Sequence, residues 1–406
     1  MSGGTGAVAR PRVLFVSHQA TRTGAPAVLL SFLAWLAEHG EVDAEVLLWR
    51  DGPTEPAFRA LAPVHVAGRF DRGSKVELLE RNLPVVGLGG VARRLQRARL
   101  KPRLKDLTGY DLYWLNCAES AHCLDHLAAV DGVVVSHVHE LEMAIAFALP
   151  DEAERRRWLE RTDHFVAVAD RVRDNLIVNE GVDPDRVSRH YEFVDADGVT
   201  APAVTTAAEL RRRLAIPDDA PVVGAAGTQE WRKGTDLFLQ LARRLEHHPW
   251  GPVHLVWVGG GPAKIEIERL GHDLAETGLA DRVHFVGEQD HAVDWYRMFD
   301  VLVLTSREDP YPLVCLEAGL VATPVVSFDN GGMAELLDGE NGIVVPALDV
   351  EAMAVAVGDL LDDPERRAAM GERLAADVRR RHDTAVAAPA LNDLMMSLLE
   401  PGRVQG

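Results

Sequence analysis

Two adjacent cations stand in a short loop in the second half of the chain. The loop spans residues 227–234, has glycine at both ends, and contains Arg232 and Lys233. Because a helix N-terminus already carries positive partial charge, two cations at a helix start are slightly unfavourable unless an anion lies between them. Arginine offers a planar fork and lysine a mobile point charge, which together suit a diphosphate. The alternative interpretation is a solvated ion pair on a surface loop.

A second polar segment lies further along the chain, at residues 305–318. It contains the carboxylates Glu308, Asp309 and Glu317, with seven residues between the last two. A Pro-Val-Val run follows at 324–326, and a Gly-Gly-x-x-Glu turn follows at 331–335. This order of motifs closely resembles the signature region of the retaining GT-B glycosyltransferases of family 4. In that family two Rossmann-like domains bind a nucleotide sugar in the cleft between them.

The resemblance extends over the whole second half and, more weakly, into the first. In the second half it includes the Arg-Lys-Gly loop, residues 258–262 and residues 285–287. In the first half it rests on residues 18–26 and on residues 137–140. A histidine after a strand contacts the donor sugar in this family, but periodicity alone does not decide whether His137 or His139 reaches the site. His139 is the better candidate because it stands just beyond the strand end.

The resemblance implies a role for each matching position. Arg232 and Lys233 hold the leaving diphosphate, Asp309 contacts the sugar ring, and Glu317 accepts hydrogen bonds from ribose. The implied catalytic residues are His139, Arg232, Lys233 and Asp309. The implied donor-binding residues are Gly24, Ala25, Gly227, Thr228, Gly259, Gly287, Glu288, Gln289, Glu308, Leu313, Val314 and Glu317. The implied acceptor-binding residues are His18, Thr23 and Glu140.

The chain departs from the family pattern at three places. Asp309 stands where the family usually has glutamate, although Glu308 is adjacent. Pro312 replaces a frequent glycine and removes an amide donor, but proline is tolerated in a first helical turn. The pair Gly24-Ala25 replaces a more usual Gly-Gly. The identity of the donor sugar therefore stays open.

Short apolar runs alternate with amphipathic stretches along both halves, which is typical of βα units and parallel sheets. The expected strands are 13–16, 45–49, 64–67, 112–115, 133–137 and 164–168, then 222–226, 254–258, 283–286, 301–304, 325–328 and 342–345. Residues 191–217 break the rhythm and are expected to be a linker with a short helix at 207–214.

The pattern predicts two α/β domains with parallel sheets, and the resemblance implies that these are the Rossmann-like domains of the GT-B fold, whose sheets face each other across a cleft. We expect an acceptor-binding domain at residues 1–195 and a nucleotide-sugar-binding domain at 196–383. A C-terminal helix at 384–406 is expected to pack back towards the first domain.

Composition limits the function further. The chain has 406 residues, with 43 Lys or Arg and 62 Asp or Glu, so its formal net charge is −19. This balance argues against a nucleic-acid partner, which requires basic surface. Three cysteines predict a reducing compartment. No signal peptide and no membrane-spanning run is recognised, so we expect a cytoplasmic protein.

One segment opposes the acidic balance. Residues 93–105 contain seven basic side chains, and such segments bind anionic membranes or acidic partners. Peripheral contact with the inner face of the membrane, or an anionic acceptor, is one hypothesis; a solvated helix and loop is the other. No metal or other cofactor is expected, although His122 with His126 and Asp195 with Asp197 have spacings that metal sites also use.

The expected function is transfer of a sugar from a UDP- or GDP-sugar to an acceptor hydroxyl, by a hexosyltransferase-type enzyme. The resemblance implies retention at the anomeric carbon without a metal ion. Two alternatives stay open: a sugar-nucleotide epimerase on the same fold, and a non-catalytic nucleotide-sugar-binding subunit. The acceptor stays unknown, with lipid-linked and anionic molecules among the candidates.

Overall fold

The computed structural model describes residues 10–68, 100, 104–247, 252–260 and 264–400. The chain divides into two compact units. Unit 1 comprises residues 1–168, 172–190 and 388–406, and unit 2 comprises 169–171 and 191–387. The sequence predicted domain boundaries at 195/196 and 383/384, and the corresponding boundaries between the two units are at 190/191 and 387/388. Most of the basic segment 93–105 lies outside the described residues.

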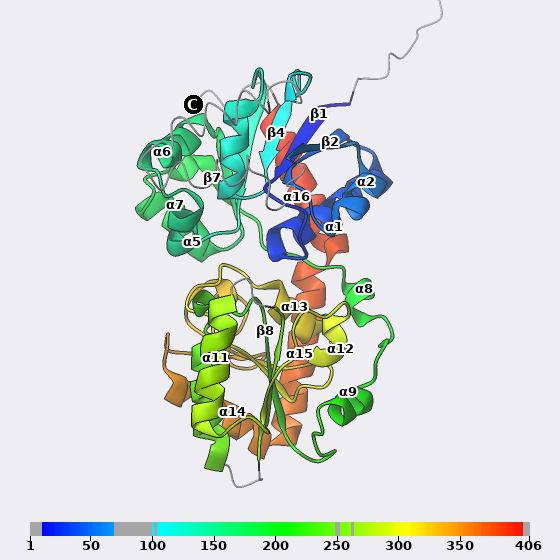
Figure 1. Cartoon of the computed structure of the whole chain (residues 1–406). Helices are drawn as coiled ribbons and strands as arrows, with labels where there is room; N and C mark the ends of the chain where they lie inside the picture. Colours follow the sequence, from blue (N-terminus) through cyan, green and yellow to red (C-terminus); the bar gives the residue numbers. More distant parts are fainter. Residues whose placement is uncertain (1–9, 69–99, 101–103, 248–251, 261–263, 401–406) are drawn as a thin grey trace, which may run out of the picture. The chain divides into compact units, whose positions relative to one another are not determined.

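Unit 1 is built on a seven-stranded parallel sheet with the order β3-β2-β1-β4-β5-β6-β7 (Figure 1). Its strands are β1 (Arg12–Ser17), β2 (Asp43–Arg50), β3 (Val64–Gly68), β4 (Leu112–Leu115), β5 (Val133–Val138), β6 (His164–Ala167) and β7 (Val187–Arg189). The central strands β1 and β4 are buried throughout their apolar residues, as expected for a sheet covered on both faces. β7 is absent from the sequence-based expectation, because three residues with two polar side chains give no apolar run.

The helices of unit 1 connect these parallel strands. They are α1 (Gly24–His39), α2 (Glu55–Leu61), η2 (Ala118–His126), α5 (Glu142–Ala148), α6 (Glu152–Arg161), α7 (Asp170–Val178) and η3 (Pro184–Arg186), with α16 (Thr384–Leu399) at the end of the chain. Within unit 1, Asn392 of α16 donates a hydrogen bond to the Glu41 carboxylate.

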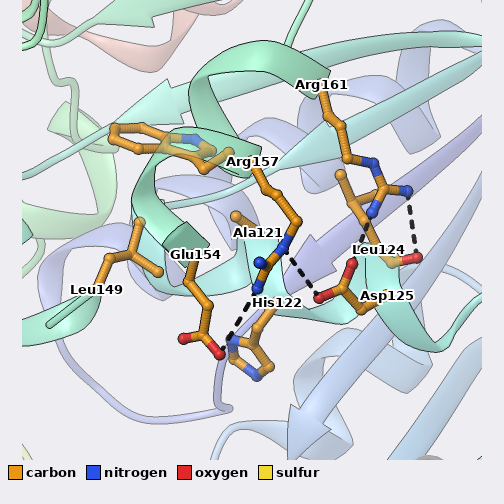
Figure 2. Close-up of a pocket in the computed structure, with 9 residues that line it drawn as sticks. Ala121, His122, Leu124, Asp125, Leu149, Glu154, Arg157 and Arg161 are labelled. Atoms are coloured by element: carbon orange, nitrogen blue, oxygen red, sulfur yellow. Dashed lines mark hydrogen bonds and ion pairs between the residues drawn. The ribbon is translucent and has the colours of Figure 1, made fainter. Parts of the chain in front are cut away.

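A small cavity lies between η2 and α6 of unit 1 (Figure 2). Its volume is about 10 Å³, which is room for about one water molecule. Arg161 forms an ion pair with Asp125 at 2.8 Å across this cavity. His122 lines it and also packs edge-on against Trp49, with ring centroids 4.6 Å apart. Within the described part of the chain, no group of three or more His, Cys, Asp or Glu side chains is arranged to hold a metal.

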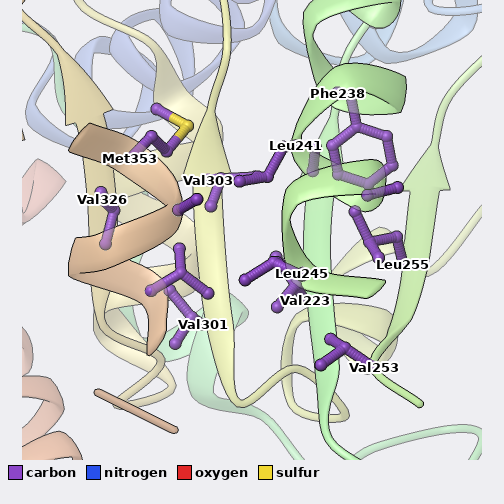
Figure 3. Packing of buried hydrophobic residues seen from close by; sticks show 14 of the residues in the cluster. Val223, Phe238, Leu241, Leu245, Val253, Leu255, Val301, Val303, Val326 and Met353 are labelled. Carbon is purple, nitrogen blue, oxygen red and sulfur yellow. The ribbon is translucent and has the colours of Figure 1, made fainter. Parts of the chain in front are cut away.

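Unit 2 is built on a six-stranded parallel sheet with the order β10-β9-β8-β11-β12-β13. Its strands are β8 (Val222–Ala226), β9 (His254–Val258), β10 (Val283–Phe285), β11 (Val301–Leu304), β12 (Val325–Phe328) and β13 (Ile343–Val345). The four longest are fully buried. One core cluster joins these strands to the helices α10 (Thr235–Arg244) and α14 (Val350–Asp362), and it includes Phe238, Leu241 and Met353 (Figure 3).

The helices of unit 2 are α8 (Ala196–Thr200), α9 (Ala207–Arg213), η4 (Trp231–Lys233), α10 (Thr235–Arg244), η5 (Leu245–His247), α11 (Lys264–Thr277), α12 (Ala292–Tyr296), α13 (Leu313–Leu320), η6 (Gly332–Glu335), α14 (Val350–Asp362) and α15 (Pro364–His382). The prediction of a linker at residues 191–217 with one short helix is wrong in one respect, because these residues also form the short helix α8. A capping box of Thr206 and Glu209 starts α9 where the sequence predicts a helix, since it satisfies two amide donors that the helix leaves exposed. No helix among the described residues is long and apolar enough to cross a membrane.

Candidate functional site

The candidate donor residues of unit 2 follow the strands at one edge of the sheet. Because all strands run parallel, the carboxyl ends of β8, β9, β10 and β11 meet at that edge. The Gly227 amide donates to Val258 O at 2.9 Å, and the Gly259 amide donates to Gly287 O at 2.9 Å. A side chain at Gly259 would place Cβ 2.1 Å from Gly227 O, at a φ of +128°. The three loops therefore approach so closely that Gly259 must be glycine.

The loop at residues 227–234, here called the cation loop, contacts the segment at residues 305–318, here called the signature segment. Lys233 Nζ lies 2.6 Å from Asp309 Oδ2, and Ser306 Oγ donates to the same oxygen at 2.9 Å. Asp309 is only 4% exposed. Arg232 donates to the Glu308 carbonyl at 3.1 Å and forms an ion pair with Glu230 at 3.0 Å. The structure thus brings Arg232, Lys233, Glu308 and Asp309 together, and it gives Asp309 a lysine partner that sequence reasoning did not foresee.

Glycine also fixes the end of the cation loop. Gly234 adopts a φ of +73°, and a Cβ there would lie 2.0 Å from Thr305 O. This close approach lets the main chain turn directly from η4 into α10. Lys233, at the end of η4, is thus held beside Thr305, whose hydroxyl donates to Lys233 O at 3.1 Å, and its side chain reaches Asp309.

The helix α13 carries three of the residues expected to bind the donor: Leu313, Val314 and Glu317. It begins at Leu313 directly after Pro312, so the proline is tolerated as expected. The first amides of a helix have no acceptor within that helix, and those of Leu313 and Val314 are in this position. Glu317 lies one turn further on the same face. Burial raises the pKa of the Glu317 carboxyl to about 7.

The base-binding candidates follow β10. Gln289 Nε2 donates to Val286 O at 2.7 Å, which curls residues 286–289 into a compact turn. Glu288 packs beside Gly260, whose absent Cβ would lie 2.9 Å from Glu288 Cγ. Thr228 follows β8 in the neighbouring loop.

Sequence reasoning missed Arg307, which organises the cation loop. Its guanidinium binds Asp236 through two hydrogen bonds of 2.8 and 2.7 Å and lies 4.4 Å from the centroid of the Trp231 ring. Its amide donates to Arg232 O at 2.7 Å. The only signal available was an arginine directly before the two carboxylates of the signature segment.

The carboxyl edge of the sheet in unit 1 gathers a second polar cluster. Glu140 Oε2 accepts hydrogen bonds from the amides of His139 at 2.9 Å and Ala118 at 3.3 Å. His18 Nδ1 lies 3.0 Å from Cys117 Sγ. Burial raises the pKa of Glu140 to about 7, and burial together with nearby positive charge lowers the pKa of His18 to about 4. His18, His139 and Glu140 therefore share one edge of this unit.

The structure distinguishes His137, which is in β5, from His139, which follows it. His137 is buried inside the strand and packs edge-on against Trp114, with ring centroids 5.4 Å apart. His139 follows the strand and is partly exposed. This arrangement favours His139 over His137 as the side chain that can meet a ligand.

The start of α1 is tied to the same edge. Asn116 Nδ2 donates to Ala25 O at 2.8 Å, a contact that sequence reasoning missed. Thr23 and Gly24 are exposed at the helix start, and a Cβ at Gly24 would meet nothing within 4 Å. Packing within unit 1 therefore does not require glycine at this position, which leaves room for a ligand beside it.

Known proteins match this chain over both units. The sequence profile of the family described as Glycosyl transferases group 1 matches residues 220–363. A D-inositol 3-phosphate glycosyltransferase of Acidothermus cellulolyticus is 31% identical over 370 residues, covering 86% of this chain and 80% of that protein. The chain belongs to the group 1 glycosyltransferases. A second relative, the lipopolysaccharide core biosynthesis mannosyltransferase LpcC of Rhizobium leguminosarum bv. viciae, is 30% identical over 290 residues, covering 67% of this chain and 76% of that protein.

Other known proteins match this chain over less of their length, or in the fold alone. A D-inositol 3-phosphate glycosyltransferase of Xylanimonas cellulosilytica is 37% identical over 246 residues, covering 57% of this chain and 56% of that protein. Among solved structures, Anabaena HepE in complex with UDP-glucose matches with a TM-score of 0.77 at 19% identity, covering 95% of this chain and 99% of that chain. These findings confirm the GT-B fold that the signature motifs predict.

The carboxylate of Glu140 is expected to hold the unit 1 cluster of this glycosyltransferase together. Glu140→Ala removes the acceptor of two amides, so the free energy of unfolding should fall by about 1–3 kcal/mol. Glu142→Ala is the matched control, because Glu142 is exposed at the start of α5. Urea denaturation of both variants measures the difference. Equal stability of the two variants would show that the main chain at His139 and Ala118 does not depend on the Glu140 carboxylate.

Proposed function

We propose that this glycosyltransferase moves a hexose from a UDP- or GDP-sugar to an acceptor hydroxyl, with retention at the anomeric carbon and without a metal ion. The observation that carries the proposal is the Lys233–Asp309 pair beside Arg232, at the carboxyl edge of the unit 2 sheet. Its ligand class is supported by the fold neighbour HepE, which is described in complex with UDP-glucose.

The leaving diphosphate is proposed to compete with Asp309 for Lys233. In this step the bond between the anomeric carbon and the phosphate oxygen breaks, and negative charge develops on the diphosphate. Lys233 and Arg232 place positive charge where that charge develops, which removes the need for a metal ion. Asp309, once its lysine turns to the phosphate, is available to accept a hydrogen bond from a sugar hydroxyl.

Retention follows if the acceptor attacks from the face that the leaving group occupies. The acceptor oxygen forms the new bond to the anomeric carbon, and its proton passes to the departing phosphate oxygen. The protein then mainly positions the reactants. The chain supplies positioning groups of this kind in Glu317 and the amides of Leu313 and Val314 in unit 2, and in His139 in unit 1.

The acceptor is proposed to bind at the unit 1 cluster of His18, Thr23, His139 and Glu140. Relatives named for D-inositol 3-phosphate and for the lipopolysaccharide core suggest a polyol phosphate or a saccharide as the acceptor class.

Mass spectrometry of single sugar nucleotides, each with and without an acceptor panel of inositol phosphate and mannose oligosaccharides, tests this proposal. We expect an acceptor-dependent glycoside that keeps the donor's anomeric configuration by NMR and forms equally well with EDTA. A product with the opposite configuration would overturn retention. Donor epimerised without acceptor would indicate the epimerase, and donor binding without any product would indicate a non-catalytic subunit.

A further inference from the structure

A fully buried histidine lies behind the signature segment of unit 2. His382 is the last residue of α15 and is 0% exposed. Its Nδ1 lies 2.9 Å from Glu192 O, and its Nε2 lies 3.1 Å from Tyr311 Oη. Tyr311 is itself only 3% exposed. The imidazole therefore bridges two segments that are 119 positions apart in the chain.

The Glu192 carbonyl fixes which nitrogen of the imidazole carries a proton, and the direction of the second hydrogen bond follows for the neutral ring. A carbonyl oxygen only accepts, so Nδ1 must carry the proton that is donated to Glu192. In the neutral imidazole Nε2 is then an acceptor, and the Tyr311 hydroxyl donates to it. The result is a continuous chain from the Tyr311 hydroxyl through the ring to the Glu192 carbonyl. Such a chain is satisfied at both ends and rigidifies its surroundings.

One end of this hydrogen-bond chain is Tyr311, which belongs to the signature segment. Tyr311 stands two residues after Asp309, in the turn that leads into α13. The neighbouring main chain is held by Gly332, whose amide donates to Pro310 O at 2.8 Å, and by a bridge between Asp309 and Gly331. The Tyr311 hydroxyl adds a side-chain anchor to these main-chain anchors.

The other end reaches the two segments through which the chain enters and leaves unit 2. Val194 pairs with Asp383 in a parallel bridge, and the Val194 amide donates to His382 O at 2.9 Å. The Thr384 amide in turn donates to Val194 O at 2.9 Å. His382 is thus fixed within a small hydrogen-bonded pair of segments rather than on a mobile loop.

We propose that His382 is a positioning residue of the nucleotide-sugar site. It acts through Tyr311 to hold the main chain at Asp309 in the position where the Asp309 carboxylate contacts Lys233. The proposal rests on the proposed function, since it assigns His382 a part in sugar transfer. His382 itself touches no substrate. Its effect is exerted on the main chain of residues 306–312, whose displacement by about 1 Å is enough to lower turnover.

Two variants remove the same link in different ways. Tyr311→Phe deletes only the hydroxyl, while His382→Asn keeps an amide that can donate to Glu192 O but is too short to reach Tyr311. Each should lower kcat about fivefold, equivalent to about 1 kcal/mol for one lost hydrogen bond, with the KM for the sugar nucleotide within twofold. The double variant should be no slower than either single variant, because both remove one interaction.

Thr323→Val is the matched control, because Thr323 Oγ1 donates a buried 2.8 Å hydrogen bond to Tyr296 O elsewhere in unit 2. It should lower thermal stability similarly and leave kcat unchanged. Multiplying effects in the double variant, or an equal kcat loss in Thr323→Val, would overturn the positioning role.

Hydrogen exchange of the peptide covering 306–314 separates this inference from the proposed function. We expect exchange there to be faster in Tyr311→Phe and His382→Asn than in the parent protein and in Thr323→Val. If the parent protein transfers no sugar, the proposed function fails while this link is still measured. Unchanged exchange in both variants would overturn the link whether or not the enzyme is active.

Discussion

Lys233→Ala is expected to lower kcat/KM for sugar transfer about a thousandfold while the fold is kept. The side chain supplies the positive charge nearest to Asp309, at 2.6 Å, and removal of one preorganised group of this kind typically costs a factor of 10²–10³. Steady-state kinetics with the sugar nucleotide that the parent protein uses measures this loss. Near-normal turnover would show that Lys233 does not stabilise the leaving group.

The same substitution has a separate effect on stability that must be controlled. It leaves the buried Asp309 carboxylate without its cation, and breaking a buried pair in this way costs about 3–5 kcal/mol. Adding Asp309→Asn removes the uncompensated charge, so the double variant should recover most of the lost stability. Its activity should stay low. Recovery of activity together with stability would mean that the single variant was merely unfolded.

Glu317→Gln is expected to weaken nucleotide binding about 10- to 100-fold. A hydrogen bond to a charged group contributes about 1.5–3 kcal/mol, and the amide offers the ribose hydroxyls a neutral acceptor instead. Isothermal titration with the nucleoside diphosphate at pH 8 measures the change, since the carboxyl, with a pKa of about 7, is then ionised. An unchanged dissociation constant would show that Glu317 does not bind the ribose hydroxyls.

The raised pKa of Glu317 also predicts how stability depends on pH. Between the ordinary carboxyl pKa and about 7, the folded protein holds a proton that the unfolded chain has lost, so this group lowers stability as the pH rises through that window. Glu317→Gln should therefore be more stable than the parent protein at pH 8, by about 1–2 kcal/mol, and no more stable at pH 4.5. One pKa unit corresponds to 1.36 kcal/mol, and partial exposure of the side chain reduces the full effect.

Thermal denaturation at the two pH values checks this dependence. Glu351→Gln is the matched control, because Glu351 is exposed in the first turn of α14. The stabilisation at pH 8 should be seen in Glu317→Gln alone. A pH-independent difference between Glu317→Gln and the parent protein would contradict burial as the cause of the raised pKa.

Most strands of both sheets could be predicted from the sequence, because a buried parallel strand is a continuous apolar run. Residues 222–226, 254–258 and 325–328 are predicted with the bounds that the structure has. β7 and α8 could not be predicted in this way. Their short polar sequences, Val-Ser-Arg and Ala-Asp-Gly-Val-Thr, show neither the helical nor the strand spacing of apolar residues. Tertiary contacts decide their conformation.

The location of the candidate site was predictable, but its internal pairing was not. Loops that follow parallel strands must meet at one edge of the sheet, and the resemblance implied a shared site for Lys233 and Asp309. Their 2.6 Å contact joins residues 76 positions apart. The same holds for Arg307 with Asp236 and for His382 with Tyr311. A single sequence gives no signal for such partners, because many charged or polar side chains could serve equally well.

We propose that Lys233 in unit 2 binds the diphosphate of a nucleotide sugar. Thermal denaturation with UDP, GDP and the corresponding monophosphates tests it most directly, because a ligand that binds only the folded state raises the melting temperature in proportion to ln(1 + [L]/Kd). We predict that one diphosphate stabilises the parent protein more than its monophosphate does, and that this difference is lost in Lys233→Ala combined with Asp309→Asn. Equal stabilisation of the parent protein and the double variant, or no stabilisation by either diphosphate, would show that Lys233 does not bind the diphosphate.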